Sequence, residues 1–221
     1  SIDLSLTSEH QLVAESARAF AQAEIAPHIA EWDAKGEYHR DVFEQMGDMG
    51  FLGAPIHERW GGAGMDYISL GILCEEMERV DSAYRVVLSV HTALNSLTLM
   101  QWATEEQKQR WLVPQAQGRK LATFGLTEPG SGTDAVAMAT TARKDGDSYV
   151  LNGSKLWISL ADIADHFLVF AATDRTKKHK GITAFVVERG MPGLTTGTIH
   201  GKLGIRAGYK GSIFFDDVRV P

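Results

Sequence analysis

The spacing of apolar residues divides the chain into two parts with different periods. Up to about residue 118, apolar side chains recur every three or four positions, which is the period of an amphipathic helix. After Gly118 they form short runs rich in β-branched and aromatic residues, separated by Gly, Asn and Asp, which is typical of strands joined by turns. The pattern therefore predicts an α+β chain, with an all-helical domain over residues 1–118 and a β domain over residues 119–221.

Several helix boundaries can be read in the first part. Ser8 and Gln11 have the spacing of a capping box at the start of the first helix, and Pro27 interrupts or bends that helix. Further helices are predicted at 41–49, 67–79 and 82–102, and Thr104 with Gln107 caps another. The residues expected to face inward from the helices that begin near residues 8 and 67 are Leu12, Val13, Ser16, Ala17, Phe20, Ala21, Leu70, Leu73, Cys74 and Met77.

The second part reads as a series of short strands. Turn dipeptides are found at Asp145-Gly146 and Asn152-Gly153. Many short strands with regular turns predict a small barrel or sandwich, of which we expect a barrel. The predicted strands are 121–126, 136–143, 148–151, 156–159, 167–172, 182–188 and 212–215.

Charge and composition argue against two kinds of site. The net charge of −6 over 221 residues does not favour a nucleic-acid partner, because a phosphate backbone is bound through clustered Lys and Arg. The one basic run, residues 175–180, lies between two predicted strands and is interpreted as a solvated hairpin tip rather than a binding patch. The eight histidines are scattered without ligand spacing, so no metal site is predicted.

Cysteine usage and hydropathy bear on the compartment. Cys74 is the only cysteine, which excludes an internal disulfide and predicts a reducing compartment with Cys74 in the core. Residues 1–10 lack the apolar core of a signal peptide, and the most apolar stretch, 86–99, is too short and too polar to span a bilayer. We therefore expect no transmembrane segment and a cytoplasmic protein, or a mitochondrial matrix protein if the source is eukaryotic.

The turn at 127–134 is the first candidate for chemistry. Gly130 and Gly132 allow backbone N–H groups to converge on an anion, and Ser131 and Thr133 add hydroxyl donors without adding charge. Such a turn suits a pyrophosphate. A plain β-turn with glycines for geometry is the alternative.

A second candidate lies in the strand that follows. Trp157 and Ser159 are two residues apart, so in a regular strand an indole and a hydroxyl share one face. The indole can stack on a flat ring system while the hydroxyl or a backbone amide bonds the edge of that ring. Burial of Trp157 in the core is the alternative.

These segments together resemble the acyl-CoA dehydrogenases. The matching segments are 124–134 (Phe-Gly-Leu-Thr-Glu-Pro-Gly-Ser-Gly-Thr-Asp), 152–159 (Asn-Gly-Ser-Lys-Leu-Trp-Ile-Ser), 202–207 and 215–221, in the order and spacing of that family. In the helical part, 25–27, 50–53, 60–64 and 103–108 also fit. The resemblance therefore covers essentially the whole chain.

The resemblance implies an FAD enzyme. Such an enzyme removes the α-proton of an acyl-CoA thioester with a base and transfers the β-hydrogen as hydride to flavin N5, and an electron-transfer flavoprotein then accepts the electrons. Phe124 and Ser159 stand where family members often have Tyr and Thr, so the first position loses a hydroxyl and the second keeps one. The cofactor residues that the family pattern implies are Phe124, Leu126 and Thr127 at the pyrimidine edge, Gly132 and Thr133 at a phosphate, and Trp157 and Ser159 by the ring near N5.

The family also implies a substrate site. Val86, Val90 and Leu94 would face the acyl tail, and Thr133 is also assigned to the substrate side; internal helix packing is the alternative for the three apolar residues. Residues 76–85 resemble the glutaryl-CoA dehydrogenases, in which the residue matching Arg85 binds the distal carboxylate of the substrate. Val86 departs from that subfamily, which usually has Ser there, and an ion pair of Arg85 with Asp81 is the alternative.

The family continues as a third domain of four helices, which carries the catalytic base and the tetramer contacts. The last Glu of this chain, Glu188, does not match that base. We therefore expect the first two domains of such an enzyme, inactive alone and homo-oligomeric in full length. Two rival hypotheses are an acyl-CoA oxidase or flavin monooxygenase on the same scaffold, and a non-catalytic fragment that binds a nucleotide or a partner protein.

Overall fold

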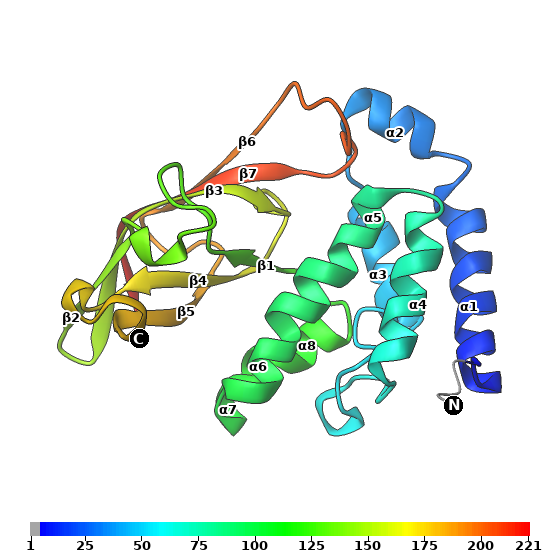
Figure 1. Cartoon of the computed structure of the whole chain (residues 1–221), viewed down its shortest axis with the longest axis horizontal. Coiled ribbons are helices and arrows are strands. Elements are labelled where there is room, and N and C mark those ends of the chain that lie inside the picture. The colour runs from blue at the N-terminus through cyan, green and yellow to red at the C-terminus, as the bar shows by residue number, and fades with distance from the viewer. Residues whose placement is uncertain (1–4) are drawn as a thin grey trace. The chain divides into compact units, whose positions relative to one another are not determined.

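The computed structural model describes residues 5–221. The chain forms two compact units. The first unit comprises the residues up to Arg119 together with Leu203–Gly208, and the second comprises Lys120–Lys202 and Tyr209–Pro221. Residues 1–4, part of the polar start from which no signal peptide was expected, lie outside the described residues. The first unit is helical and the second is built on one sheet (Figure 1).

Helices of the first unit begin and end close to the predicted positions. A π-helical segment, Leu88–Ser96, joins α5 to α6 into one continuous helix over 82–102, as predicted. Pro27 lies in the turn between a second π-helical segment, Ala21–Ile25, and α2, which confirms the predicted interruption. The α-helices are α1 Ser8–Phe20, α2 Ile29–Lys35, α3 Arg40–Asp48, α4 Tyr67–Glu78, α5 Ser82–Val87, α6 Leu97–Trp102, α7 Glu105–Gln107 and α8 Val113–Ala116.

The cap of α1 lies one residue before the predicted one. Thr7, with extended φ and ψ of −71° and 167°, is the N-cap, and its hydroxyl accepts from the backbone N–H of His10 at 3.2 Å. The His10 ring in turn accepts from the backbone N–H of Thr7 at 3.3 Å, so His10 takes the place expected for Gln11. Ser8 is already helical and cannot serve as the cap. The capping box of Thr104 and Gln107 is confirmed.

The buried face of α1 is centred on His10, Ala17 and Phe20. Leu12, expected to face inward, is 63% exposed, because two positions along a helix turn a side chain about 200° away from His10. On α4 the prediction was better, since Leu70, Leu73 and Met77 are buried and Cys74 is half-buried.

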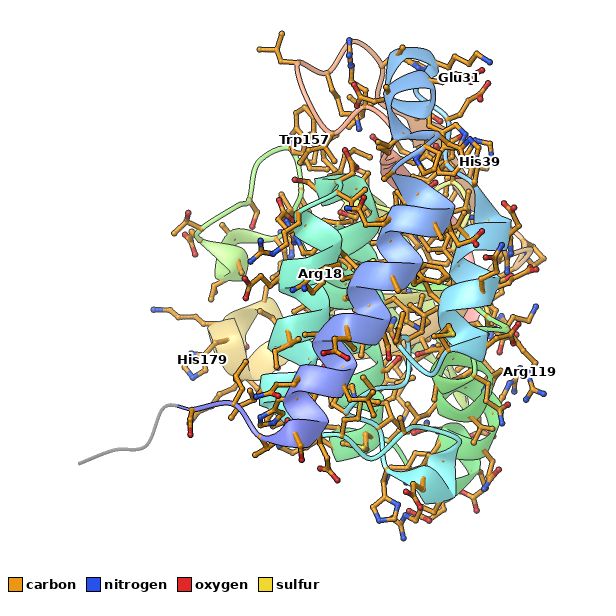
Figure 2. The ribbon with its side chains drawn as sticks, turned by 90° about the vertical axis from the view of Figure 1, so that its right-hand side faces the viewer. Arg18, Glu31, His39, Arg119, Trp157 and His179 are labelled. Carbon is orange, nitrogen blue, oxygen red and sulfur yellow. The ribbon has the colours of Figure 1, made fainter. Side chains whose placement is uncertain are left out.

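An ion pair joins α1 to α4, which lie side by side (Figure 1). The Arg18 guanidinium donates to both carboxylate oxygens of the buried Glu76, at 2.7 and 3.0 Å. Figure 2 labels Arg18 on the side of α1 that faces a neighbouring helix. The pair satisfies a buried carboxylate, which the Arg79 guanidinium also approaches at 3.7 Å.

Asp66, the N-cap of α4, is expected to stabilise the fold less at low pH. The backbone N–H of Ser69 and the His10 ring lower the pKa of Asp66, the N-cap, to about 2. Because this pKa lies below that of the unfolded chain, the stabilisation is present above about pH 4 and is lost as the pH falls towards 2. We expect Asp66→Asn, which keeps a capping oxygen, to lower Tm at pH 6 and to have a much smaller effect near pH 2, where about half of the Asp66 carboxyl groups are protonated in the folded state. A Tm difference that is constant with pH would contradict this assignment.

The second unit is a seven-stranded, curled sheet. The strand order is β1-β4-β2-β3-β7-β6, with β5 paired to the other edge of β4; β1 and β2 run parallel to β4, and the remaining pairs are antiparallel. The sheet curls into a half-barrel, which confirms the predicted small barrel over the sandwich. The strands are β1 Ala122–Gly125, β2 Thr141–Asp145, β3 Ser148–Ser159, β4 His166–Ala172, β5 Ile182–Glu188, β6 Leu194–Thr198 and β7 Lys210–Val220.

The sequence prediction of the strands failed at three places. The predicted turn at Asn152-Gly153 is wrong, because β3 continues through these two residues. The Asn152 side-chain amide donates to the carboxylate of Asp217, which lies in a bulge of β7, at 2.9 Å. Residues 135–137 form a 3-10 turn before β2 begins at Thr141, and the edge strand β6 was missed. The turn at Asp145-Gly146 is confirmed.

Candidate functional site

The two segments singled out in the β part lie side by side. The backbone N–H of Leu156 donates to the carbonyl of Thr127 at 2.9 Å, and the Thr123 hydroxyl donates to the carbonyl of Ser159. The residues just after β1 are therefore bonded to the C-terminal half of β3. This brings Leu126 and Thr127 next to the strand that carries Trp157 and Ser159.

Trp157 stands at a bulge in β3. Lys155 is opposite Ile213 and Ile158 is opposite Gly211, so β3 carries one extra residue at this point. Trp157 has φ of 62°, a left-handed conformation that is uncommon for a bulky residue, and it is 56% exposed. Core burial, the alternative for this residue, is therefore wrong.

The bulge also breaks the alternation that was predicted between Trp157 and Ser159. Ile158, Ser159 and Leu160 are all buried while Trp157 is exposed. The Lys210 ammonium donates to Ser159 Oγ, so the hydroxyl hydrogen of Ser159 remains available to donate elsewhere.

The turn at 127–134 uses only some of its polar groups internally. Ser131 is buried, and its hydroxyl donates to the carbonyl of Asp134 at 2.7 Å. Gly132 and Thr133 are exposed. Gly130 and Gly132 have φ values that any residue adopts, and a Cβ on either would meet open space, so the backbone geometry of the turn does not require glycine. The glycines do leave the exposed side of the turn unobstructed.

Three hydrogen-bonding groups around this turn and bulge are uncommitted. Within residues 5–221 the hydroxyls of Thr127 and Thr133 and the indole N–H of Trp157 have no hydrogen-bond partner. Phe124, half-buried on β1, packs its ring against Phe170 with centroids 5.1 Å apart. An aromatic ring and uncommitted donors thus occur together on one unit.

Beneath this surface lies a buried ion pair that the sequence analysis missed. Lys155 is fully buried, and its Nζ donates to Glu128 Oε1 at 2.7 Å and to the Leu126 carbonyl at 3.1 Å. Glu128 also accepts from the backbone N–H groups of Ala139 and Thr140. Both charged residues were inside the quoted segments, and a Lys within an apolar strand run was the available signal.

The pKa shifts agree with a charged pair. Burial by itself would raise the pKa of Glu128, but the hydrogen bonds from Lys155, Thr140 and Ala139 outweigh it and lower that pKa. Burial lowers the pKa of Lys155, against the opposing effect of Glu128. We assign both groups as charged, because each is the partner of the other at hydrogen-bond distance.

The residues predicted on the substrate side belong to the other, helical unit, except Thr133. Arg85 donates to Glu78 at 2.5 Å and to the Ser89 hydroxyl at 2.9 Å, so the ion pair considered as the alternative does form, but with Glu78 rather than Asp81. Asp81 instead caps α5 by accepting from the backbone N–H of Ala83.

Three apolar residues form a stripe along the helix of α5 and α6. Val86 and Val90 are half-buried and Leu94 is 41% exposed, whereas the opposite side of the same helix carries Leu88 and Leu99 in the core. The stripe is therefore not part of the fully packed core that internal helix packing would require.

The basic run at residues 175–180 is exposed to solvent. The run lies in a 3-10 segment, Arg175–Gly181, between β4 and β5, which confirms the predicted solvated tip; His179 projects from it in Figure 2.

Among residues 5–221 no group of His, Cys, Asp and Glu could hold a metal ion. In the same part of the chain, no helix has the length and apolar character to cross a membrane.

Comparison with known families decides the relationship. The acyl-CoA dehydrogenase N-terminal domain matches residues 7–119, and the acyl-CoA dehydrogenase middle domain matches residues 123–218. The chain belongs to the acyl-CoA dehydrogenase family. The resemblance inferred from the motifs is thereby confirmed.

Individual acyl-CoA dehydrogenases are similar over the whole chain. The short-chain-specific acyl-CoA dehydrogenase of Clostridium acetobutylicum is 44% identical, with 100% of this chain and 58% of that protein covered. The butyryl-CoA dehydrogenase structure from Megasphaera elsdenii has a TM-score of 0.96 at 39% identity, covering 100% of this chain and 58% of the other. The FAD complex of a Bacillus anthracis acyl-CoA dehydrogenase has a TM-score of 0.89 at 32% identity, covering 98% and 37%. The chain thus spans little more than half of the first two relatives and little more than a third of the last.

Proposed function

We propose that this chain is the helical and middle part of an FAD-dependent acyl-CoA dehydrogenase, and that residues 124–133 with 157–159 form its share of the flavin site. The observation that carries the proposal is the 2.9 Å bond between Leu156 and Thr127, which joins the turn to the strand bearing the exposed Trp157. FAD, when bound, supplies the hydride acceptor.

The residues of the sheet unit fit a flat, phosphate-bearing cofactor. The Trp157 indole offers a face for stacking, and its left-handed backbone at the bulge turns it outward. The hydroxyls of Thr127 and Ser159 can hydrogen-bond the edge of a ring, and the Lys210 contact orients the Ser159 hydrogen. Thr133 and the unobstructed turn at Gly130 and Gly132 suit a phosphate. Leu126 and Phe124 complete the apolar border.

The substrate assignment rests on the helical unit. We propose that Val86, Val90 and Leu94 face the acyl chain, because an exposed apolar stripe beside a packed core is the type of surface that an acyl group covers. Arg85 is already paired with Glu78 and Ser89, which favours a short monocarboxylic acyl group over a dicarboxylic one. A distal carboxylate would have to share the guanidinium with Glu78, which already neutralises its charge. By the family resemblance, Thr133 is also assigned to the substrate side of the site.

The complete protein has further proposed partners. By family analogy it acts in the cytoplasm or the mitochondrial matrix, passes electrons to an electron-transfer flavoprotein and assembles as a homo-oligomer. Removal of the α-proton needs a base within hydrogen-bond reach, and we assign that role to none of residues 5–221. Glu188, at the end of β5, does not match the family's base.

Anaerobic reduction of the flavin tests the proposed function. We expect the complete encoded polypeptide to purify with FAD, and butyryl-CoA to bleach its visible flavin band without oxygen and more rapidly than glutaryl-CoA does. An artificial acceptor should then sustain turnover. A colourless protein that does not take up FAD would contradict the proposal, whereas turnover that requires oxygen would assign an oxidase or monooxygenase.

A further inference from the structure

The position of the Glu128–Lys155 ion pair is unusual for a purely structural contact. The Lys155 side chain is fully buried and that of Glu128 is 3% exposed, so both charges have lost nearly all their water. Removing two charges from water costs several kcal/mol, and apolar residues of similar volume often stabilise a fold at least as well. A reason other than stability is therefore expected for charges at this place.

The pair holds both ends of the segment 126–140, which bears Gly132 and Thr133. At the near end, Lys155 Nζ binds the Leu126 carbonyl at 3.1 Å, directly before the Thr127 carbonyl that accepts from Leu156. At the far end, the Glu128 carboxylate accepts from the backbone N–H groups of Ala139 and Thr140, the latter at 3.1 Å. The segment from 126 to 140 is thus closed by one carboxylate and one ammonium.

The same lysine lies two residues before the exposed indole, at the start of the bulge in β3. In a regular strand Lys155 and Trp157 would share a face, since they are two residues apart. The extra residue of the bulge separates them: Lys155 is fully buried, while Trp157 is 56% exposed. Anchoring Lys155 under the turn holds the bulge, and with it the outward direction of Trp157.

We propose that the Glu128–Lys155 pair positions the flavin, by holding Leu126 and Thr127 on one side and Trp157 on the other in the arrangement that receives the isoalloxazine ring. Neither residue touches the cofactor, so both are positioning residues. This inference rests on the proposed function, because it presumes that FAD binds at this surface. It adds two residues to the site, and their effect is exerted through backbone and indole geometry.

Measurement of FAD binding by variants of the complete polypeptide tests the proposal. We expect Lys155→Met and Glu128→Gln each to raise the FAD dissociation constant about tenfold or more, as is typical when partners that orient a binding group are lost. We also expect the visible circular dichroism of bound flavin to change, because it reports the asymmetry of the ring's surroundings. Glu128→Gln keeps the size of the side chain, so it serves if Lys155→Met does not fold.

Glu76→Gln is the matched control. It likewise weakens a buried carboxylate pair, with Arg18, but in the helical unit rather than in the sheet unit. We expect its FAD dissociation constant and flavin dichroism to equal those of the parent. Parent-like affinity and dichroism in Glu128→Gln, or equal losses in Glu76→Gln, would overturn the positioning role and leave the proposed function intact. A parent protein that does not bind FAD would instead overturn the proposed function.

Discussion

Replacing Lys155 with Met is expected to lower the free energy of unfolding of the sheet unit by about 3–5 kcal/mol. Lys155 is fully buried and bonded to Glu128 at 2.7 Å, so its loss leaves a buried carboxylate with only the two backbone N–H groups of Ala139 and Thr140. Because the chain has two units, the effect is best measured by hydrogen exchange of the β3 and β7 amides, which reports opening of the sheet locally.

A second lysine in the same unit supplies the control. Lys177 pairs with Asp174 at 3.3 Å, but both side chains are exposed. Lys177→Met should change the free energy of opening, obtained from the same exchange rates, by less than about 1 kcal/mol, since exposed pairs are weak. The double variant Glu128→Leu/Lys155→Met should be more stable than Lys155→Met alone. If the double variant were less stable than the single one, the buried pair would not be the cause of the loss.

Replacing Trp157 with Ala is expected to weaken FAD binding about fivefold to a hundredfold, because stacking on an aromatic side chain is worth about 1–3 kcal/mol. The same change should leave the stability of the sheet unit nearly unaltered, since Trp157 is 56% exposed and Ala keeps the Cβ on which the cost of the left-handed backbone depends. Fluorescence titration of the FAD-free protein measures the affinity. Trp157→Phe, which keeps a ring, should lose less.

Phe214→Ala is the matched control for this prediction. Phe214 is an aromatic residue of β7 in the same unit, 47% exposed, and has no assigned role in the site. We expect its loss to leave FAD affinity unchanged. Equal affinity of Trp157→Ala and Phe214→Ala would mean that the indole does not stack on the flavin.

The sequence predicted the two-part architecture and most helix ends because these depend on local periods and caps. It misplaced the cap of α1 by one residue, since Thr7 and Ser8 can both serve as N-caps and only the extended backbone conformation of Thr7 decides between them. Asn152-Gly153 has the composition of a hairpin turn, yet it is used inside β3 opposite a bulge in β7, a contact with a residue 65 positions away. Such pairings are not encoded in a short window.

In the candidate site, too, features that depend on residue type could be predicted, whereas features that depend on distant contacts could not. The exposed indole and the glycine-rich turn were recognisable from their residue types, and the family resemblance supplied their roles. The outward turn of Trp157 depends on a one-residue bulge, and the pairing of Glu128 with Lys155 joins residues 27 positions apart. Alternation along a strand predicted a shared face for Trp157 and Ser159, and the bulge made that prediction wrong.

Hydrogen exchange of the complete polypeptide with and without FAD tests the central claim most directly. We predict that FAD slows exchange at the amides of residues 124–133 and 156–159 together, while the amides of β6, Leu194–Thr198, exchange at unchanged rates. Binding of FAD that leaves both of these segments unprotected would show that the turn after β1 and the bulge in β3 do not form the flavin site.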